Sequence, residues 1–329
     1  MGIKSARRTP WGKLLGAPAA AALAGIGYSA LFVPRALPLP PAIEAERRET
    51  SSRAGTLSFY VAGQGAPLLL IHSVNAAASA YEVRPIFEHF AGSRRVYALD
   101  LPGFGFSERS NRDYTPRLYT DALLDLLDLI GAECDGAPVD ALAVSLGGEF
   151  LARAASERPE RFRSLALVSP TGFDEGERFY GEPGSVRGFP PLRQLYEFPL
   201  WGRALFNALN SRPSQRYFLS RTFGSYETID QGLLEYDYLT AHQPGAQHAP
   251  FTFITGGLFS ADIDRVYEQL RMPVWLAYGV RGDFGQVRDI SNIDRRDNWT
   301  LQKFDTGMLP HFEQRDSFMS LYEAFLNGK

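Results

Sequence analysis

One continuously apolar segment constrains the fold of this chain more than any other feature. Residues 67–73 read PLLLIHS, and a strand with apolar side chains at successive positions is buried on both of its faces. Such a strand needs a sheet that is covered by helices on both sides. The sequence therefore predicts an α/β protein with a mostly parallel, doubly wound sheet.

Strand-like and helix-like segments alternate along the chain around this apolar strand. The strands 56–62 and 67–73 are separated by a turn at Gly63 and Gly65, so we expect them to be neighbours in the sheet. The further expected strands are residues 95–100, 139–144, 164–169, 272–279 and 300–305, and the expected helices are residues 81–91, 116–131, 147–157 and 312–326.

The alternation breaks over a long middle segment, residues 171–262. This segment is rich in Phe, Tyr, Arg, Gly and Pro, and it contains helical pieces such as PLWGRALFNAL without an obvious strand pattern. We interpret it as a mainly helical cap inserted into a single sheet domain. The core of that domain would consist of residues 55–170 and 263–329.

Residues 1–33 combine a basic start with an apolar run. Residues 1–13 carry two lysines, two arginines and no acid, and residues 14–33 carry no charge. A helix of about 20 residues spans roughly 30 Å, the thickness of a bilayer's hydrocarbon core. We predict a signal or membrane-anchor segment at 14–33 that places the folded domain outside the cytoplasm. The alternatives are a helix packed on the domain and a cytoplasmic protein. Residues 34–54, proline-rich and then charged, are expected to form a spacer without a core of their own.

Net charge and cysteine content exclude several classes of function. The formal net charge is −3, so the chain has no bulk attraction for the phosphate backbone of nucleic acids. Cys134 is the only cysteine, which rules out an internal disulfide, and no Cys/His cluster has the spacing of a zinc site. We expect no nucleic-acid partner, no metal and no cofactor.

A serine stands where one expected strand gives way to a helix. Residues 143–148 read AVSLGG, so Ala143 and Gly147 lie two positions away from Ser145 on either side. A sharp strand-to-helix turn needs such small neighbours, and it presents the hydroxyl at the carboxyl edge of the sheet. The following helix start favours developing negative charge there. The pattern indicates a nucleophilic serine, and a helix-capping serine is the alternative.

With these segments in order, the chain resembles the α/β-hydrolase superfamily over residues 56–170 and 272–326. Besides ALAVSLGG, the resemblance is carried by LLLIHSVN at 68–75, DLPGFGFSERS at 100–110, YGVRGDF at 278–284 and GMLPHFEQRDSF at 307–318. In this family the catalytic acid follows the penultimate strand and the histidine follows the last strand, which implies Asp283 and His311. Asp289 and Asp174 remain alternative acids.

The resemblance implies a triad in which each residue has a separate task. A serine hydroxyl is a poor nucleophile at neutral pH unless a base removes its proton, and His311 titrates in the range needed to do so. Asp283 would fix the tautomer of that histidine and stabilise its cation, while Ser145 attacks the substrate. The family's two oxyanion donors would be the backbone N–H groups of Val74 and Leu146.

The loop before Val74 departs from the family pattern. Ser73 stands where the family has a glycine after its histidine, which narrows the backbone angles open to the loop. Ser73 and Asn75 could bind substrate through their side-chain donors, or they could be turn residues. We expect His72 to support this loop and to take no part in proton transfer.

The expected cap contains many aromatic residues. We expect Phe173, Phe179 and Trp201 to line a pocket for an apolar or aromatic small molecule, although rings of this kind also hold a cap together. The leading function is hydrolysis of a small apolar or aromatic carboxylic ester through an acyl-enzyme intermediate. The alternatives are a carbon–carbon bond or lactone hydrolase with the same triad, and a non-catalytic protein that binds a small ligand on this fold.

Overall fold

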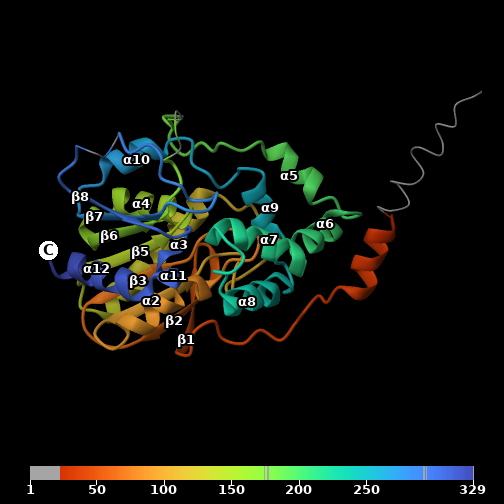
Figure 1. Ribbon diagram of the computed structural model, residues 1–329, viewed down its shortest axis with the longest axis horizontal. Helices are drawn as coiled ribbons and strands as arrows, with labels where there is room; N and C mark the ends of the chain where they lie inside the picture. The colour runs from red at the N-terminus through yellow and green to blue at the C-terminus, as the bar shows by residue number, and fades with distance from the viewer. Residues whose placement is uncertain (1–22, 174, 176–177, 292, 294, 329) are drawn as a thin grey trace, which may run out of the picture.

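An eight-stranded sheet runs through the centre of the molecule (Figure 1). The computed structural model describes residues 23–173, 175, 178–291, 293 and 295–328. The strands lie in the order β1-β2-β4-β3-β5-β6-β7-β8. They are β1 (Glu46–Ser52), β2 (Gly55–Ala62), β3 (Pro67–Ile71), β4 (Arg95–Asp100), β5 (Val139–Val144), β6 (Phe162–Val168), β7 (Val274–Gly279) and β8 (Trp299–Phe304).

Most neighbouring strands run parallel. Only the pairs β1–β2 and β2–β4 are antiparallel among the strands that the structure describes. All residues of β3 are buried, and Leu70 lies opposite Ala98 of β4 and Leu142 of β5. The mostly parallel sheet predicted from the apolar strand is thus confirmed.

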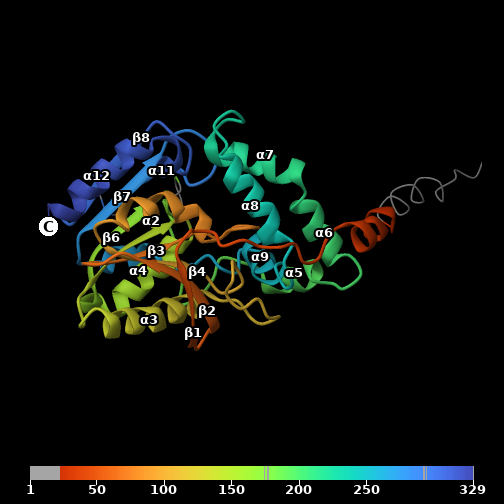
Figure 2. The same ribbon diagram turned by 90° about the horizontal axis from the view of Figure 1, so that it is seen from below.

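Helices cover both faces of the sheet (Figure 2). The helices α3 (Pro116–Glu133), α4 (Gly147–Glu157) and α10 (Ile263–Gln269) pack on one face, against side chains such as Leu69 and Ile71. The helices α2 (Arg84–Phe90) and α12 (Arg315–Asn327) pack on the other face, against Leu68 and Leu70. Alternate residues of β3 therefore point into two separate cores, which explains why the whole strand is apolar.

The structure differs from the sequence-based expectation at the antiparallel edge. Strands β2 and β3 are not neighbours, because β4 lies between them. The expected spacer 34–54 contributes β1, and Ala42 is buried with its N–H donating to the Tyr60 hydroxyl (2.9 Å). Strand β1 is polar, with the sequence ERRETSS, because an edge strand pairs through its backbone and exposes most side chains. Its polarity concealed it in the sequence.

The segment between β6 and α10 is mainly helical in its described residues, as predicted for the cap. Its helices are α5 (Pro190–Tyr196), α6 (Gly202–Leu209), α7 (Arg212–Phe223), α8 (Gln231–Ala241) and α9 (His248–Ile254). They gather at one end of the sheet (Figure 1). Helix α8 contacts the 3-10 helix η1 (Ala80–Val83), which lies beyond the carboxyl end of β3. The cap thus meets the core at the edge where the parallel strands end.

The described part of the N-terminal apolar run is a helix over residues 23–32. This helix is joined to α6 by a hydrogen bond from Asn207 Nδ2 to Ser29 Oγ (2.7 Å). The remainder of the predicted signal or anchor segment, residues 14–22, lies outside the described residues. Within the part of the chain that the structure describes, no helix combines the length and apolarity needed to cross a membrane.

Candidate active site

Ser145 occupies the sharp turn between β5 and α4. Its φ is 51°, in the left-handed region that non-glycine residues rarely adopt. The turn is held by two backbone hydrogen bonds, from Ser145 N–H to the Val168 carbonyl and from Gly148 N–H to the Ser145 carbonyl, both 2.9 Å long. A methyl group at Gly147 would lie 2.5 Å from the backbone oxygen of His72. Position 147 therefore needs a glycine because the loop after β3, which contains His72, packs directly against it.

The two backbone N–H groups expected as oxyanion donors have no hydrogen-bond partner among the described residues. Neither Leu146 N–H nor Val74 N–H donates a hydrogen bond to any described residue. Leu146 is the N-cap residue of α4, where backbone N–H groups have no partner within the helix. Neither group is committed to another partner in the described part of the chain, and the oxyanion role of the two groups stays a prediction.

The side chains of Ser73 and Asn75 are committed to a carboxylate. Glu82, in η1, accepts hydrogen bonds from Ser73 N–H (2.7 Å), Ser73 Oγ (2.9 Å) and Asn75 Nδ2 (2.9 Å). Asn75 Oδ1 in turn accepts from Ala77 N–H (2.7 Å). These are the contacts expected of turn residues, and direct substrate binding by the two side chains stays a prediction.

His72 braces the same loop from the other side. Its Nδ1–H donates to the Ser73 carbonyl (2.5 Å), and its Nε2 accepts from Leu101 N–H (2.9 Å). The ring is fully buried, and this burial lowers the pKa of His72 to about 3. A neutral imidazole with both nitrogens in hydrogen bonds has no free nitrogen for proton transfer. The contacts of His72 thus agree with the predicted supporting role.

His311 lies in the short helix α11 (Pro310–Glu313) and is fully buried. Its Nε2–H donates to the backbone carbonyl of Glu82 (2.7 Å), while Nδ1 has no hydrogen-bond partner among the described residues. Burial lowers the pKa of His311 to about 4, and the hydrogen bond to Glu82 opposes this shift. His311 also lines a cavity of about 140 Å³ together with Tyr81 and Asp230. His311 is therefore neutral at physiological pH and holds a free lone pair on Nδ1.

The structure does not bring Asp283 to His311. The Asp283 side chain is 48% exposed and forms an ion pair with Arg221 of α7. Its backbone N–H also donates to the Arg221 carbonyl (3.0 Å). In the described part of the chain, no carboxylate is hydrogen-bonded to His311, and no hydrogen bond joins His311 to the Ser145 hydroxyl. The three predicted residues share the carboxyl edge of the sheet, but they form no hydrogen-bonded triad here.

Of the two alternative acids, Asp289 lies in the described part of the chain and has other partners. Asp289 pairs with Arg178 (2.8 Å) and accepts from Ser291 N–H (2.9 Å). Asp174 lies outside the described residues.

The three aromatic residues expected in the pocket have different surroundings. Phe173 is buried in the core, where its ring stacks on Tyr267 at a centroid distance of 5.0 Å. Phe179 lies under the guanidinium of Arg187, 3.9 Å from the ring centroid. Trp201 is partly exposed and donates from Nε1 to the Leu195 carbonyl (2.9 Å). These contacts are those of packing residues, the other role that such rings have in a cap.

Glu82 and Asp237 are buried acids that the sequence pattern did not single out. Glu82 follows the Ser73 loop in a segment expected to be helical, where an acid in the first turn is ordinarily solvated. Burial instead raises the pKa of Glu82 to about 7. Asp237 of α8 is also buried, and burial together with the charge of Glu82 raises its pKa well above the ordinary value. Only the packing of cap on core places the two acids in one environment.

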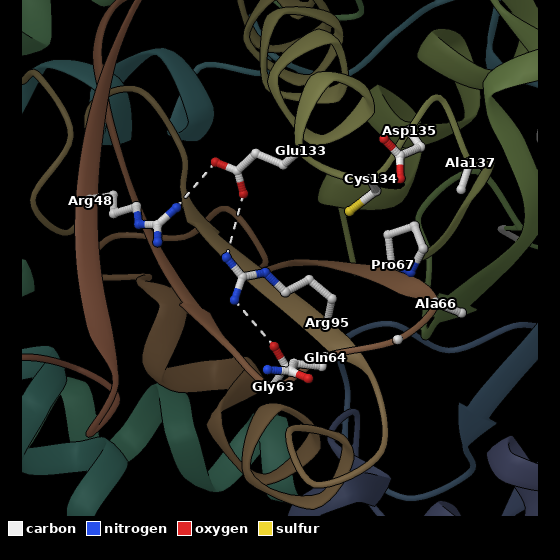
Figure 3. A pocket seen from close by; sticks show the side chains of 11 residues that line it. Arg48, Gly63, Gln64, Ala66, Pro67, Arg95, Glu133, Cys134, Asp135 and Ala137 are labelled. Carbon is white, nitrogen blue, oxygen red and sulfur yellow. Dashed lines mark hydrogen bonds and ion pairs between the residues drawn. The ribbon is translucent and has the colours of Figure 1, made fainter.

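A larger cavity, of about 800 Å³, lies at the opposite edge of the sheet from Ser145. Figure 3 shows the side chains that line it. It is lined by residues at the beginning of β3 and β4, whereas Ser145 follows the end of β5. Its charged residues neutralise one another, because Glu133 pairs with both Arg48 (3.1 Å) and Arg95 (3.5 Å). This cavity is therefore separate from the candidate active site.

Comparison with known proteins agrees with this architecture. The family model described as alpha/beta hydrolase fold matches residues 66–250. A 2-hydroxymuconate semialdehyde hydrolase of Pseudomonas sp. (strain CF600) is 30% identical over 164 residues, which are 49% of this chain and 56% of the relative. A haloalkane dehalogenase of Agrobacterium fabrum is 33% identical over 111 residues, 33% of this chain and 34% of the relative. The matches thus span between about a third and about half of these relatives.

Solved structures match over more of the chain. A meta-cleavage product hydrolase from Pseudomonas fluorescens IP01 superposes with a TM-score of 0.63 and 21% identity, covering 85% of this chain and 97% of its own. A carboxylesterase from Bacillus subtilis superposes with a TM-score of 0.62 and 18% identity, covering 94% of this chain and 98% of its own. At these identities the likeness concerns the fold. Because the family model matches more than half of the 329 residues, this chain belongs to the alpha/beta hydrolase fold family.

Proposed function

We propose that the protein is a serine hydrolase in which Ser145 is the nucleophile and His311 the general base. The observation that carries this proposal is the strained Ser145 turn, with φ of 51°, and the N–H groups of Leu146 and Val74 support it because neither has a partner among the described residues. Such a turn presents a nucleophilic serine, and backbone N–H groups without partners can stabilise the oxyanion that develops when the serine attacks.

The state of His311 fits the role of a base. Its Nε2–H is held by the Glu82 carbonyl, so Nδ1 carries the lone pair that accepts a proton. Attack by Ser145 requires its hydroxyl to approach this imidazole within hydrogen-bond distance, which is often reached only with substrate bound. The proton would then pass to the leaving group.

Asp283 remains the proposed acid of the triad. To reach His311 it must leave Arg221, and their ion pair is about half exposed. Exposed pairs of this kind contribute about 0–1 kcal/mol, so an exchange of partners is inexpensive. A substrate that moves α7 would favour this exchange, because Arg221 belongs to the cap.

Two bond types are candidates for the substrate. A small apolar or aromatic carboxylic ester is one, supported by the serine nucleophile and by the superposition on a carboxylesterase. The other candidate is a carbon–carbon bond next to a carbonyl, supported by the partial sequence match to a 2-hydroxymuconate semialdehyde hydrolase. This candidate is at least as well supported as the ester. Both reactions use the same serine, histidine and oxyanion donors.

A direct turnover comparison tests the proposal. Short p-nitrophenyl esters, aryl lactones and a vinylogous diketone would be offered to the native chain and to Ser145→Ala. We expect at least one class to be turned over by the native chain alone. If Ser145→Ala retained the native rate on every substrate that is consumed, the proposed nucleophile would be wrong. If no substrate is consumed and a small ligand binds tightly, the non-catalytic alternative is supported.

We also propose that the N-terminal region attaches the protein to a membrane surface. The uncharged run 14–33 supports this, as do Leu23, Leu31 and Phe32, which are exposed on the described helix 23–32. Attachment along the surface needs an apolar face and nearby basic residues, and it needs no helix that spans the bilayer. The location of the folded domain outside the cytoplasm stays a prediction.

A further inference from the structure

Glu82 joins two separate parts of the candidate active site. Its carboxylate accepts three of the hydrogen bonds that fix the loop of Ser73 and Asn75, at 2.7, 2.9 and 2.9 Å. Its backbone carbonyl accepts from His311 Nε2–H at 2.7 Å. A single residue thus fixes the loop that carries the Val74 N–H group and the imidazole proposed as the base.

The carboxylate explains the serine that replaces a glycine in this loop. Ser73 is buried, and a buried hydroxyl that lacks an acceptor is costly. Glu82 Oε1 is that acceptor, and Oε2 binds the backbone N–H of the same residue. Because Ser73 N–H is occupied by Glu82, the first N–H group of this loop without a partner among the described residues is that of Val74.

The cap covers Glu82 and keeps water away from it. Tyr81, the residue before Glu82, stacks on Tyr236 of α8 with ring centroids 5.0 Å apart. Asp237 follows on α8 and is buried, and its Oδ1 has no hydrogen-bond partner within the described residues. In such a dry environment the hydrogen bonds of Glu82 hold the loop more rigidly than they would in water.

We propose that Glu82 is a positioning residue of this hydrolase, which sets the Val74 oxyanion donor through Ser73 and the His311 tautomer through its own carbonyl. This inference rests on the proposed function. Its physical basis is that a carboxylate only accepts hydrogen bonds, so it can serve three donors at once. A glutamine at position 82 cannot serve all three donors. In one orientation its amide nitrogen would face Ser73 N–H, and in the other it would replace the oxygen that accepts from both Ser73 Oγ and Asn75 Nδ2.

The test compares Glu82→Gln with the matched control Glu88→Gln, which lies six residues further on and is paired at the surface with Arg84 (2.8 Å) and Arg315 (3.3 Å). We expect Glu82→Gln to lower kcat about 10- to 100-fold with KM changed less than about twofold, since an oxyanion donor acts in the transition state. Glu88→Gln should keep both constants. Circular dichroism and thermal melting establish whether each variant is folded.

A second variant separates positioning from a general loss of structure. Ser73→Ala removes only the hydroxyl that bonds to Glu82, and we expect it to lower kcat by a smaller factor. The double variant Ser73→Ala/Glu82→Gln should lose less than the product of the two single losses, because both act through one hydrogen bond. If Glu82→Gln fails to fold, Ser73→Ala and Asn75→Ala decide the question.

The two failures can be told apart. Inactivity of the native chain, or full activity of Ser145→Ala, would contradict the proposed function itself. An active native chain with an inactive Ser145→Ala, and with folded Glu82→Gln and Ser73→Ala both at native kcat, would overturn the role of Glu82 alone. Strictly multiplicative losses in the double variant would also overturn it.

Discussion

At the scale of single residues, the turn at Ser145 is limited by the space beside it. A methyl group at Gly147 would lie 2.5 Å from the His72 carbonyl oxygen, closer than real contacts allow. We expect Gly147→Ala to destabilise the fold by about 1–3 kcal/mol and to displace the Ser73 loop. Gly148→Ala is the control, because its methyl group would meet Leu167 and Pro170 at 3.4 Å. Equal unfolding free energies for the two variants in urea would refute this steric account.

The buried His311 makes stability depend on pH with a defined sign. Its pKa falls from 6.5 to about 4 on folding, so between these values the unfolded chain binds a proton that the folded chain does not. Stability is therefore lost as pH falls from about 6.5 to 4, by up to about 3 kcal/mol for this group.

Two neighbouring groups also make the stability depend on pH, and their contributions must be distinguished from that of His311. His72 shifts in the same direction, and Glu82, whose pKa rises to about 7, contributes stability that is lost as pH rises from about 4.5 to 7. We expect His311→Gln, which keeps a donor but cannot titrate, to lose less stability than the native chain between pH 7.5 and 4.5. Parallel urea curves at both pH values measure this, and identical losses would contradict the burial of a neutral His311.

At the scale of elements, Asp283 shows how the cap can control the core. It follows β7, yet its partner Arg221 belongs to α7 of the inserted segment. If Asp283 approaches His311 during turnover, Asp283→Asn should lower kcat about 10²- to 10⁴-fold, because the carboxylate that stabilises the imidazolium cation is then lost. Asp289→Asn should keep the native kcat, and Arg221→Gln should not lower it. Native kcat in Asp283→Asn would exclude this acid.

The sequence predicted those elements whose burial leaves a pattern along the chain. Strand β3 is apolar at every position because it faces two cores, and the small residues around Ser145 reflect a local steric limit. Strand β1 leaves no such pattern, since it is a polar edge strand. The predicted pairing of β2 with β3 was wrong, because a short connection can also join two strands that are not neighbours in the sheet.

The candidate site was less predictable than the fold. Chain order places Asp283 and His311 at the correct edge of the sheet, but it carries no information on side-chain direction. That direction depends on Arg221 and Glu82, which are about 60 and 230 residues away in the chain. Glu82 itself resembles an ordinary first-turn acid, and only tertiary packing reveals that it is buried.

At the scale of the whole molecule, the cap and the N-terminal helix lie at the same end (Figures 1 and 2). Many of the exposed apolar side chains belong to these two parts of the chain. They are Leu23, Tyr28, Leu31 and Phe32 in the helix 23–32, and Phe189, Leu192, Leu195, Phe198, Leu200, Trp201 and Leu205 in and around α5 and α6. Clustered exposed apolar residues mark interaction surfaces, and aromatic residues next to basic ones suit a membrane interface.

This arrangement gives a prediction for membrane attachment. The full chain should float with vesicles that contain anionic lipid, and a chain that begins at residue 34 should remain in solution or bind much more weakly. High salt should weaken binding, because the basic residues of 1–13 contribute to it. Equal recovery of both chains in the soluble fraction would contradict the proposed attachment.

The central claim is that Ser145 is a nucleophile activated by His311, and covalent labelling with a fluorophosphonate tests it most directly. Mass spectrometry of the native chain should show one adduct, located on the peptide that contains Ser145. Ser145→Ala should show none, and His311→Ala should be labelled far more slowly, although both variants melt as the native chain does. Equal labelling of all three proteins, or an adduct on another residue, would contradict the account.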